Sequence, residues 1–220
     1  MSMRSRFDEQ LRQLNDALIE MAEIVKQAIA KANKALIEQD FELARQIVAS
    51  DDEIDDKEKE IESFCLKLIL QQQPVAKDLR LVSAVLKIIT DLERIGDHAT
   101  DISEITLLIG DEPHIKKLEH IPKMAEASMK MLTESVEAFV KRDISLANEV
   151  IAYDDVVDEL FETVKKDLIA LIKVNAENGN QAIDLVMVAK YFERIADHAT
   201  NVAEWVVFSL TGIYKDSKVM

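Results

Sequence analysis

The chain has 220 residues, of which 48% are hydrophobic and 31% are charged, and its formal net charge is −15. This acidity repels phosphate backbones and argues against nucleic acid as a main partner. Cations and basic protein surfaces would be attracted by the negative electrostatic potential of the chain. Four glycines and three prolines are few for such a length, which argues against an all-β fold and favours long helices.

Three helices are predicted in the first half. The first carries an apolar stripe at spacings of three and four residues, formed by Leu11, Leu14, Leu18, Met21, Val25 and Ile29. Asp40 predicts an N-cap for a second helix, which runs through FELARQIVASDDEIDDKEKEIESFCLKLIL and ends at QQQP because Pro74 disfavours helical geometry in the residue before it. A third is predicted from about Val75 to Leu108. A linker follows, indicated by Gly110, Pro113 and Pro122.

The second half repeats this plan. Asp143 and ISLANEVIAYDD match Asp40 and FELARQIVASDD, which stand 103 residues earlier, and NGN at 178–180 supplies the break that Pro74 supplied. ERIADHAT at 193–200 matches ERIGDHAT at 93–100 in seven of eight positions. This pattern indicates a tandem duplication. We predict an all-α fold of two pseudo-symmetric antiparallel three-helix bundles in series, with one repeat in residues 1–110 and the other in 111–220.

The chain shows no sign of export or of a membrane anchor. MSMRSRFDEQ contains acidic residues and no apolar run, so no signal peptide is expected. The longest stretch without Asp, Glu, Lys or Arg is WVVFSLTGIY at 205–214, too short for a membrane-spanning helix of about 20 residues. The single cysteine, Cys65, excludes an internal disulfide and is expected to be an inert core thiol. We therefore expect a cytoplasmic protein without a transmembrane segment.

Two acidic pairs recur in both halves, with the members of each pair four residues apart. They are Asp51 with Asp55 and Glu93 with Asp97 in the first half, and Asp154 with Asp158 and Glu193 with Asp197 in the second. Carboxylates at this spacing share one helix face and repel each other. Two such pairs on neighbouring helices could gather four carboxylates around a hard or intermediate cation such as Mg, Ca, Mn, Fe or Zn.

Other interpretations of these acids stay open. They could be solvated or paired with the adjacent Arg94 and Arg194. The pairs one residue along, Asp52–Asp56 and Asp155–Glu159, are alternative registers. His98 and His198 each stand about 100° of helix from the aspartate before them, so hydrogen bonds to nearby groups are expected of them instead of metal ligation. No nucleophile with a matching base is recognisable, and no catalytic residue is predicted.

The sequence resembles the PhoU family of bacterial phosphate-signalling regulators over essentially its whole length. The likeness is carried by RSRFDEQLRQL, by QQQPVAKDLRLVSAVLKIITDLERIGDHATDISE and by the partial echo VAKYFERIADHATNVAE. It implies a cytoplasmic regulator without catalytic turnover that restrains phosphate uptake and phosphate-starvation signalling. The partners it implies are the ATPase component of a phosphate ABC transporter and a membrane sensor histidine kinase.

The resemblance also implies multinuclear metal clusters, of unknown metal identity, at the two sets of acidic pairs. Asp101 departs from the family pattern, in which we expect Asn, as in its counterpart Asn201. Because Asp101 lies four residues after Asp97, it could add a ligand, and the two sites could then differ in metal count. No apolar stripe in the sequence decides whether the chain forms a homodimer.

Two alternative functions remain. A carboxylate-bridged di-metal oxidase or metal-storage protein would use a helical bundle of this kind. Such di-iron sites carry His three residues after Glu, whereas His98 and His198 stand five residues after Glu93 and Glu193, which argues against this reading. A spectrin-like structural repeat with solvated acids is the third possibility.

Overall fold

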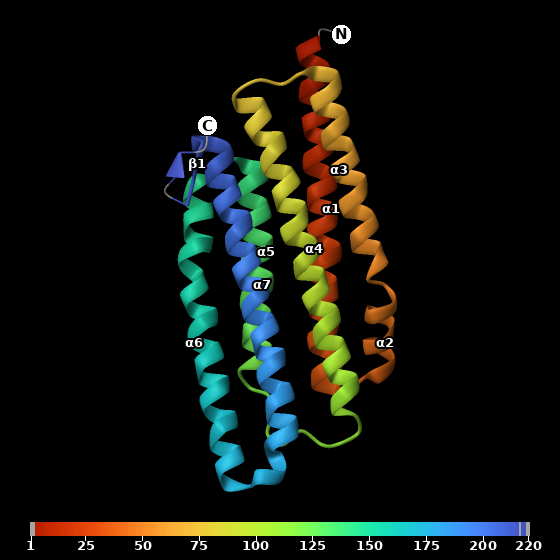
Figure 1. The fold of residues 1–220 in the computed structure, drawn as a ribbon, viewed down its shortest axis with the longest axis vertical. Coiled ribbons are helices and arrows are strands. Elements are labelled where there is room, and N and C mark those ends of the chain that lie inside the picture. Colours follow the sequence, from red (N-terminus) through yellow and green to blue (C-terminus); the bar gives the residue numbers. More distant parts are fainter. Residues whose placement is uncertain (1–2, 216, 219–220) are drawn as a thin grey trace.

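The structure, a computed structural model, describes residues 3–215 and 217–218. Nearly all of them are helical (Figure 1). In chain order the elements are α1 (Met3–Glu38), α2 (Phe41–Ala49), α3 (Asp52–Gln72), α4 (Lys77–Ile109), α5 (Ile121–Lys141), α6 (Ile144–Val174), a short 3-10 helix η1 (Ala176–Asn178), α7 (Gly179–Thr211), β1 (Ile213–Tyr214) and β2 (Ser217–Lys218).

These helices form two three-helix bundles, which confirms the predicted fold class. In the first bundle α1 and α4 pack against the middle arm formed by α2 and α3, and in the second α5, α6 and α7 pack on one another. The segment between Ile109 and Ile121 connects the two bundles. The division of the chain at residue 110 stays a prediction.

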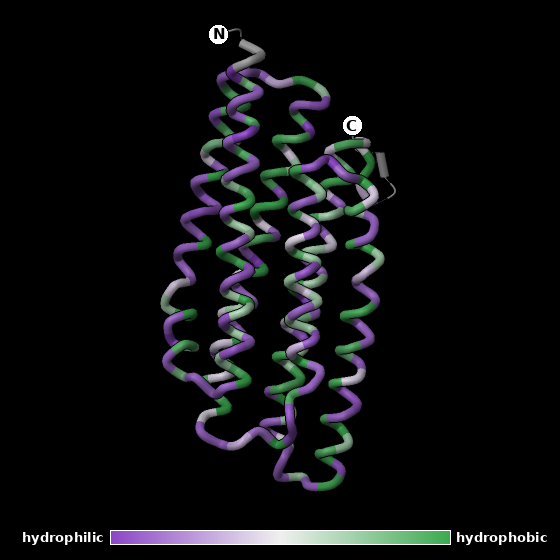
Figure 2. Tube along the Cα trace, turned by 180° about the vertical axis from the view of Figure 1, so that it is seen from behind, coloured by the Kyte–Doolittle hydropathy of each residue, from purple (hydrophilic) through white to green (hydrophobic). Residues whose placement is uncertain are grey.

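The bundles lie side by side and not in series. Helix α4 runs along α7, and α1 contacts α5 (Figure 1). The reason lies in the width of the apolar surface on the central helices, where Ile88 and Leu92 of α4 and Val188 and Phe192 of α7 have no exposed surface. A helix that is apolar around much of its circumference has to be covered on more than one side. From behind, hydrophobic and hydrophilic residues alternate along the helices (Figure 2).

The two predicted N-caps are confirmed. The Asp40 carboxylate accepts a hydrogen bond from the Leu43 amide at 3.0 Å. Asp143 accepts from the amides of Ser145 and Leu146 at 2.9 and 3.1 Å. Both side chains satisfy amides that the first turn of a helix leaves without a partner, so the two middle arms start in the same way.

The middle arm of the first bundle is broken, whereas a single helix was predicted from Asp40 to QQQP. The break falls at Ser50, whose amide and hydroxyl both donate to the Ile47 carbonyl at 3.0 Å. A serine side chain that bonds to the backbone competes with continuation of a helix. The counterpart of Ser50 in the second half is Tyr153. Its phenol is too far from the backbone to form this local hydrogen bond, and α6 continues through it.

Cys65 is buried, and burial raises the pKa of its thiol to about 12, as expected of an inert core residue. The C-terminal end differs from prediction in a small way. Gly212, at φ 80°, ends α7 and leads into the antiparallel pair β1–β2. This hairpin returns over α7, where the Tyr214 ring stacks on Trp205 at 4.0 Å. None of the helices within the described ranges has the length and apolar character needed to cross a bilayer.

Candidate metal centre

The first cluster consists of Asp51, the residue before the middle-arm helix α3, Asp55 in the first turn of that helix, and Glu93 and Asp97 on α4. Asp55, Glu93 and Asp97 each turn one carboxylate oxygen toward the others, and the three oxygens lie within 4.8 Å of one another. Asp51 stands just before α3 and accepts a hydrogen bond from Thr100 Oγ1 of α4 at 2.8 Å. The break at Ser50 therefore starts a new helix whose first turn faces α4 with carboxylates.

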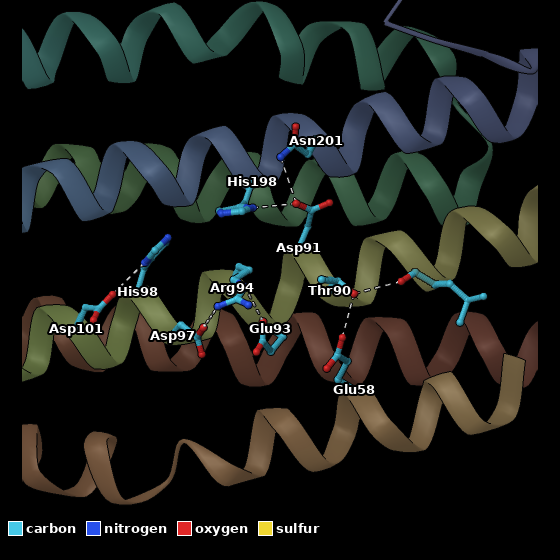
Figure 3. A network of polar contacts seen from close by, with 11 residues as sticks. Glu58, Thr90, Asp91, Glu93, Arg94, Asp97, His98, Asp101, His198 and Asn201 are labelled. Carbon is cyan, nitrogen blue, oxygen red and sulfur yellow. Dashed lines mark hydrogen bonds and ion pairs between the residues drawn. The ribbon is translucent and has the colours of Figure 1, made fainter. Parts of the chain in front are cut away.

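The first cluster holds more negative charge than its neighbours neutralise. Burial raises the pKa of Glu93, and the charge of Asp97 raises it further. Burial likewise raises the pKa of Asp97, with a contribution from Asp51. Arg94 opposes both shifts, with Nη1 lying 3.0 Å from Asp97 and Nε 3.4 Å from Glu93, but its side chain is 56% exposed (Figure 3). The expected pairing with arginine is thus present in this half, on the solvent side.

The second cluster consists of Asp154 and Asp158 on α6 and Glu193 and Asp197 on α7. Burial, followed by the charges of Asp197 and Asp158, raises the pKa of Asp154 to about 6. Burial and the charge of Glu193 raise the pKa values of Asp158 and Asp197. The four groups are therefore close enough to repel one another. Among the described residues, however, no three of their oxygens approach as closely as those of the first cluster.

The ligand chemistry of both clusters fits a cation. Glu93 Oε2 and Glu193 Oε2 are buried atoms whose partners are ion-pairing side chains of their own helices, Arg94 Nε at 3.4 Å and Lys190 Nζ. The carboxylates of each cluster still repel one another, which contributes to their raised pKa values. The candidate metal ligands are all carboxylate oxygens, which suit hard cations and can bridge two ions.

The carboxylates of the alternative registers are exposed to solvent. Asp52, Asp56, Asp155 and Glu159 are all exposed, and Asp56 pairs with Lys59 at 3.5 Å.

Asp101 also has a different neighbour from the one expected. Its Oδ2 lies 3.1 Å from His98 Nδ1, at the contact between α4 and α7, and it does not join the three oxygens of Asp55, Glu93 and Asp97 (Figure 3).

A polar bridge between the bundles was missed by the sequence analysis. Asp91 of α4 lies with Oδ1 2.8 Å from His198 Nδ1 of α7, and the same oxygen accepts a hydrogen bond from Asn201 at 3.2 Å (Figure 3). The ring centroids of His98 and His198 are 5.6 Å apart. Both histidines bond to nearby aspartates, as expected. The difference between Asp101 and Asn201 has a structural cause, because Asn201 donates to a carboxylate whereas Asp101 faces an imidazole.

Comparison with known proteins gives the same answer for both halves of the chain. The PhoU domain family matches residues 18–106 and again residues 121–206. The "Phosphate-specific transport system accessory protein PhoU homolog" of Clostridium acetobutylicum is 37% identical over 210 residues, which cover 95% of this chain and 96% of the relative. Its counterpart in Aquifex aeolicus is 40% identical over 186 residues and 84% of each chain.

Solved structures agree with these sequence matches. The crystal structure of PhoU from Pseudomonas aeruginosa superimposes with a TM-score of 0.88 at 30% identity, covering 94% of this chain and all of that one. The phosphate transport system regulatory protein PhoU from Streptococcus pneumoniae gives 0.87 at 27% identity, covering 96% of this chain and all of its own.

Proposed function

The chain belongs to the PhoU family, and from that premise we propose that it regulates phosphate uptake and phosphate-starvation signalling in the cytoplasm without catalysing a reaction. It acts by contact with the ATPase component of a phosphate ABC transporter and with a membrane sensor histidine kinase. The observation that carries this proposal is the match of both repeats, at nearly full length, to accessory proteins of the phosphate-specific transport system.

We further propose that the two clusters bind divalent or iron-type metal ions. The support is the convergence of Asp55, Glu93 and Asp97, together with the burial and mutual repulsion that raise the pKa values of carboxylates in both clusters. A bound cation would supply positive charge between carboxylates that otherwise repel. Because each cluster draws its ligands from two helices, the chain's own carboxylates would then hold α3 against α4 and α6 against α7, and so fix the surface that a partner meets.

The oxidase or storage alternative is less well supported. It needs nitrogen ligands beside the carboxylates, but His98 and His198 bond to Asp101 and Asp91 at the contact between the bundles. A purely structural repeat would leave the acids solvated, whereas the side chains of Glu93 and Glu193 are only 17% and 14% exposed. The regulator is therefore the better supported function.

The test is a pull-down from cells grown with and without phosphate, with identification of the captured proteins. We expect the transporter ATPase or the sensor kinase to co-purify with the wild type. Glu93→Gln with Asp97→Asn should reduce capture, whereas the matched control Asp52→Asn with Asp56→Asn, on the exposed register of α3, should not. Capture of neither partner under either condition would contradict the proposal.

A further inference from the structure

The two clusters differ at one pair of facing positions beside them. In the first bundle Thr90 of α4 donates a hydrogen bond to Glu58 of α3 at 3.0 Å (Figure 3). The counterpart of Thr90, 100 residues later, is Lys190, and the counterpart of Glu58, 103 residues later, is Phe161. One repeat thus places a carboxylate and a hydroxyl where the other places an aromatic ring and an ammonium group.

Lys190 is directed at the second cluster. Its Nζ forms an ion pair with Glu193 and lies 5.4 Å from the centre of the Phe161 ring. The charge of Lys190 also lowers the pKa values of Asp158 and Asp197 against the dominant effect of burial. An ammonium group over an aromatic face is held by the ring's quadrupole, and the lysine stem can pack along the same surface. Phe161 therefore helps to hold this cation in place.

The first cluster has an additional carboxylate, and the cations beside it are more exposed. Glu58 adds a fifth carboxylate beside it, and the charge of Glu58 is one of the causes that raise the pKa of Glu93. Two cations lie beside the first cluster: Arg94, whose side chain is 56% exposed, and Lys59, whose Nζ lies 4.0 Å from Asp55 Oδ2 and whose side chain is 64% exposed. Lys190 is less exposed than either, at 36%. The counterpart Arg194 does not reach the second cluster, because its guanidinium lies 5.8 Å from the centre of the Tyr191 ring.

We infer that Lys190 is a built-in counterion of the second cluster, and that the exchange of Glu58 and Thr90 for Phe161 and Lys190 makes the two clusters unequal in their affinity for divalent cations. The pair in the first cluster contributes one negative charge and the pair in the second one positive charge. A divalent ion entering the second cluster has to displace or approach an ammonium group at short range. The first cluster binds more tightly by at least about tenfold. This inference rests on the proposal that the clusters bind metal.

The experiment is a calorimetric titration of the metal-free protein with Mn²⁺, an ion that carboxylate sites accept. The wild type should show two binding events of unequal affinity. Glu93→Gln with Asp97→Asn should remove the tighter event, and Glu193→Gln with Asp197→Asn the weaker one. Lys190→Met, which keeps the stem over Phe161 but removes the charge, should tighten the weaker event by on the order of tenfold. Lys190→Arg should leave that event weak.

The converse exchange provides the matched control. Glu58→Phe with Thr90→Lys should weaken the tighter event and leave the other unchanged. A second readout needs no metal: with a chelator present, Lys190→Met should lower the unfolding midpoint by about 2–4 °C, because a counterion has been removed from four carboxylates. Helical circular dichroism confirms that each variant is folded.

The outcomes separate this inference from the proposed function. The inference would be overturned if the two binding events had equal affinity, none of the Lys190 and Thr90 variants altered them, and the metal-free unfolding midpoint were unchanged. The proposal that the clusters bind metal would still hold. If no variant and no wild-type sample binds Mn²⁺, the metal part of the proposed function falls, and the unequal affinities fall with it.

Discussion

Ile54 Cδ1 lies 2.6 Å from the point that a β-carbon on Gly96 would occupy. Gly96 is the one residue of ERIGDHAT that differs in the second copy, where Ala196 takes its place. The counterpart of Ile54 is Val157, which lacks the methyl group that makes this close approach. The two repeats have therefore diverged as a pair, glycine with isoleucine in one and alanine with valine in the other.

This pairing predicts a coupling between the two positions. Gly96→Ala should lower the free energy of unfolding by about 1 kcal/mol, because overpacking outweighs the gain in helix propensity. Ile54→Val alone should cost about 1 kcal/mol. The double variant should cost less than the sum of the two, as measured by urea unfolding in a double-mutant cycle. Additive losses would show that the methyl group has room to move aside.

The control for this cycle is in the second bundle. Ala196→Gly should cost about 1 kcal/mol through helix propensity alone, and Val157→Ile in that background should restore part of the loss.

The raised pKa of Asp154 predicts an unusual pH dependence of the metal-free protein. With a pKa of about 6 against an ordinary 3.8, the folded state binds this proton more tightly than the unfolded state does. The contribution of Asp154 to the free energy of unfolding therefore falls as the pH rises from about 4 to about 6. Urea unfolding with a chelator should show Asp154→Asn gaining on the wild type across this window. A difference between the two proteins that does not change with pH would contradict the prediction.

Asp91 should stabilise the contact between the bundles. Asp91→Ala removes the partner of both His198 and Asn201, so it should lower the free energy of unfolding by about 1–3 kcal/mol. Asp101→Ala is the matched control, because Asp101 contacts a histidine of its own helix. Its cost should be about 0.5 kcal/mol or less. Equal losses from the two substitutions, measured by urea unfolding, would mean that the bridge between the helices adds nothing.

Divalent ions should stabilise the protein through the first cluster. At an ion concentration 100 times the dissociation constant, one site adds about 2.7 kcal/mol to the free energy of unfolding. Mn²⁺ should therefore raise the thermal midpoint of the wild type and of Asp52→Asn with Asp56→Asn. Glu93→Gln with Asp97→Asn should lose the part of this stabilisation that comes from the first site. With a chelator present, the same variant should be more stable than the wild type, because the repulsion between these two carboxylates is removed. An equal rise in all three proteins would point to binding elsewhere.

Much of the fold could be predicted from the sequence because local signals recur at a constant spacing. Asp40 and Asp143 cap helices in both halves, and the apolar stripes predict helices of nearly the observed length. The break at Ser50 was missed because the acidic sequences around Asp51 and Asp154 are similar. The hydroxyl that forms the helix-breaking hydrogen bond belongs to Ser50, which is outside the acidic motif. The side-by-side packing depends on α4 and α7 meeting across the repeats, which no periodicity within one helix reveals.

The candidate site was predictable as a set of helix faces, but not in its charge balance. Spacing alone places Glu93 with Asp97 and Glu193 with Asp197. The partners of Asp91 lie on α7, across the contact between the bundles, so a single helix could not reveal them. The pair of Asp101 with His98 is within α4 and follows from its spacing of three residues. The difference at Lys190 is visible in the sequence, because an alignment of the two repeats sets it opposite Thr90. Its role as a cation beside the second cluster depends on its contact with the Phe161 ring of α6, which the alignment does not show.

The paired divergence of the repeats also limits how the molecule can be rebuilt. A chimera that carried the α7 sequence in place of α4 would set the alanine of the second copy against Ile54 and a lysine against Glu58, so one contact would clash and the other would neutralise the wrong cluster. Helices could be exchanged between the halves only together with their facing partners. Duplication began this protein as two equal copies, and its two halves are no longer interchangeable parts.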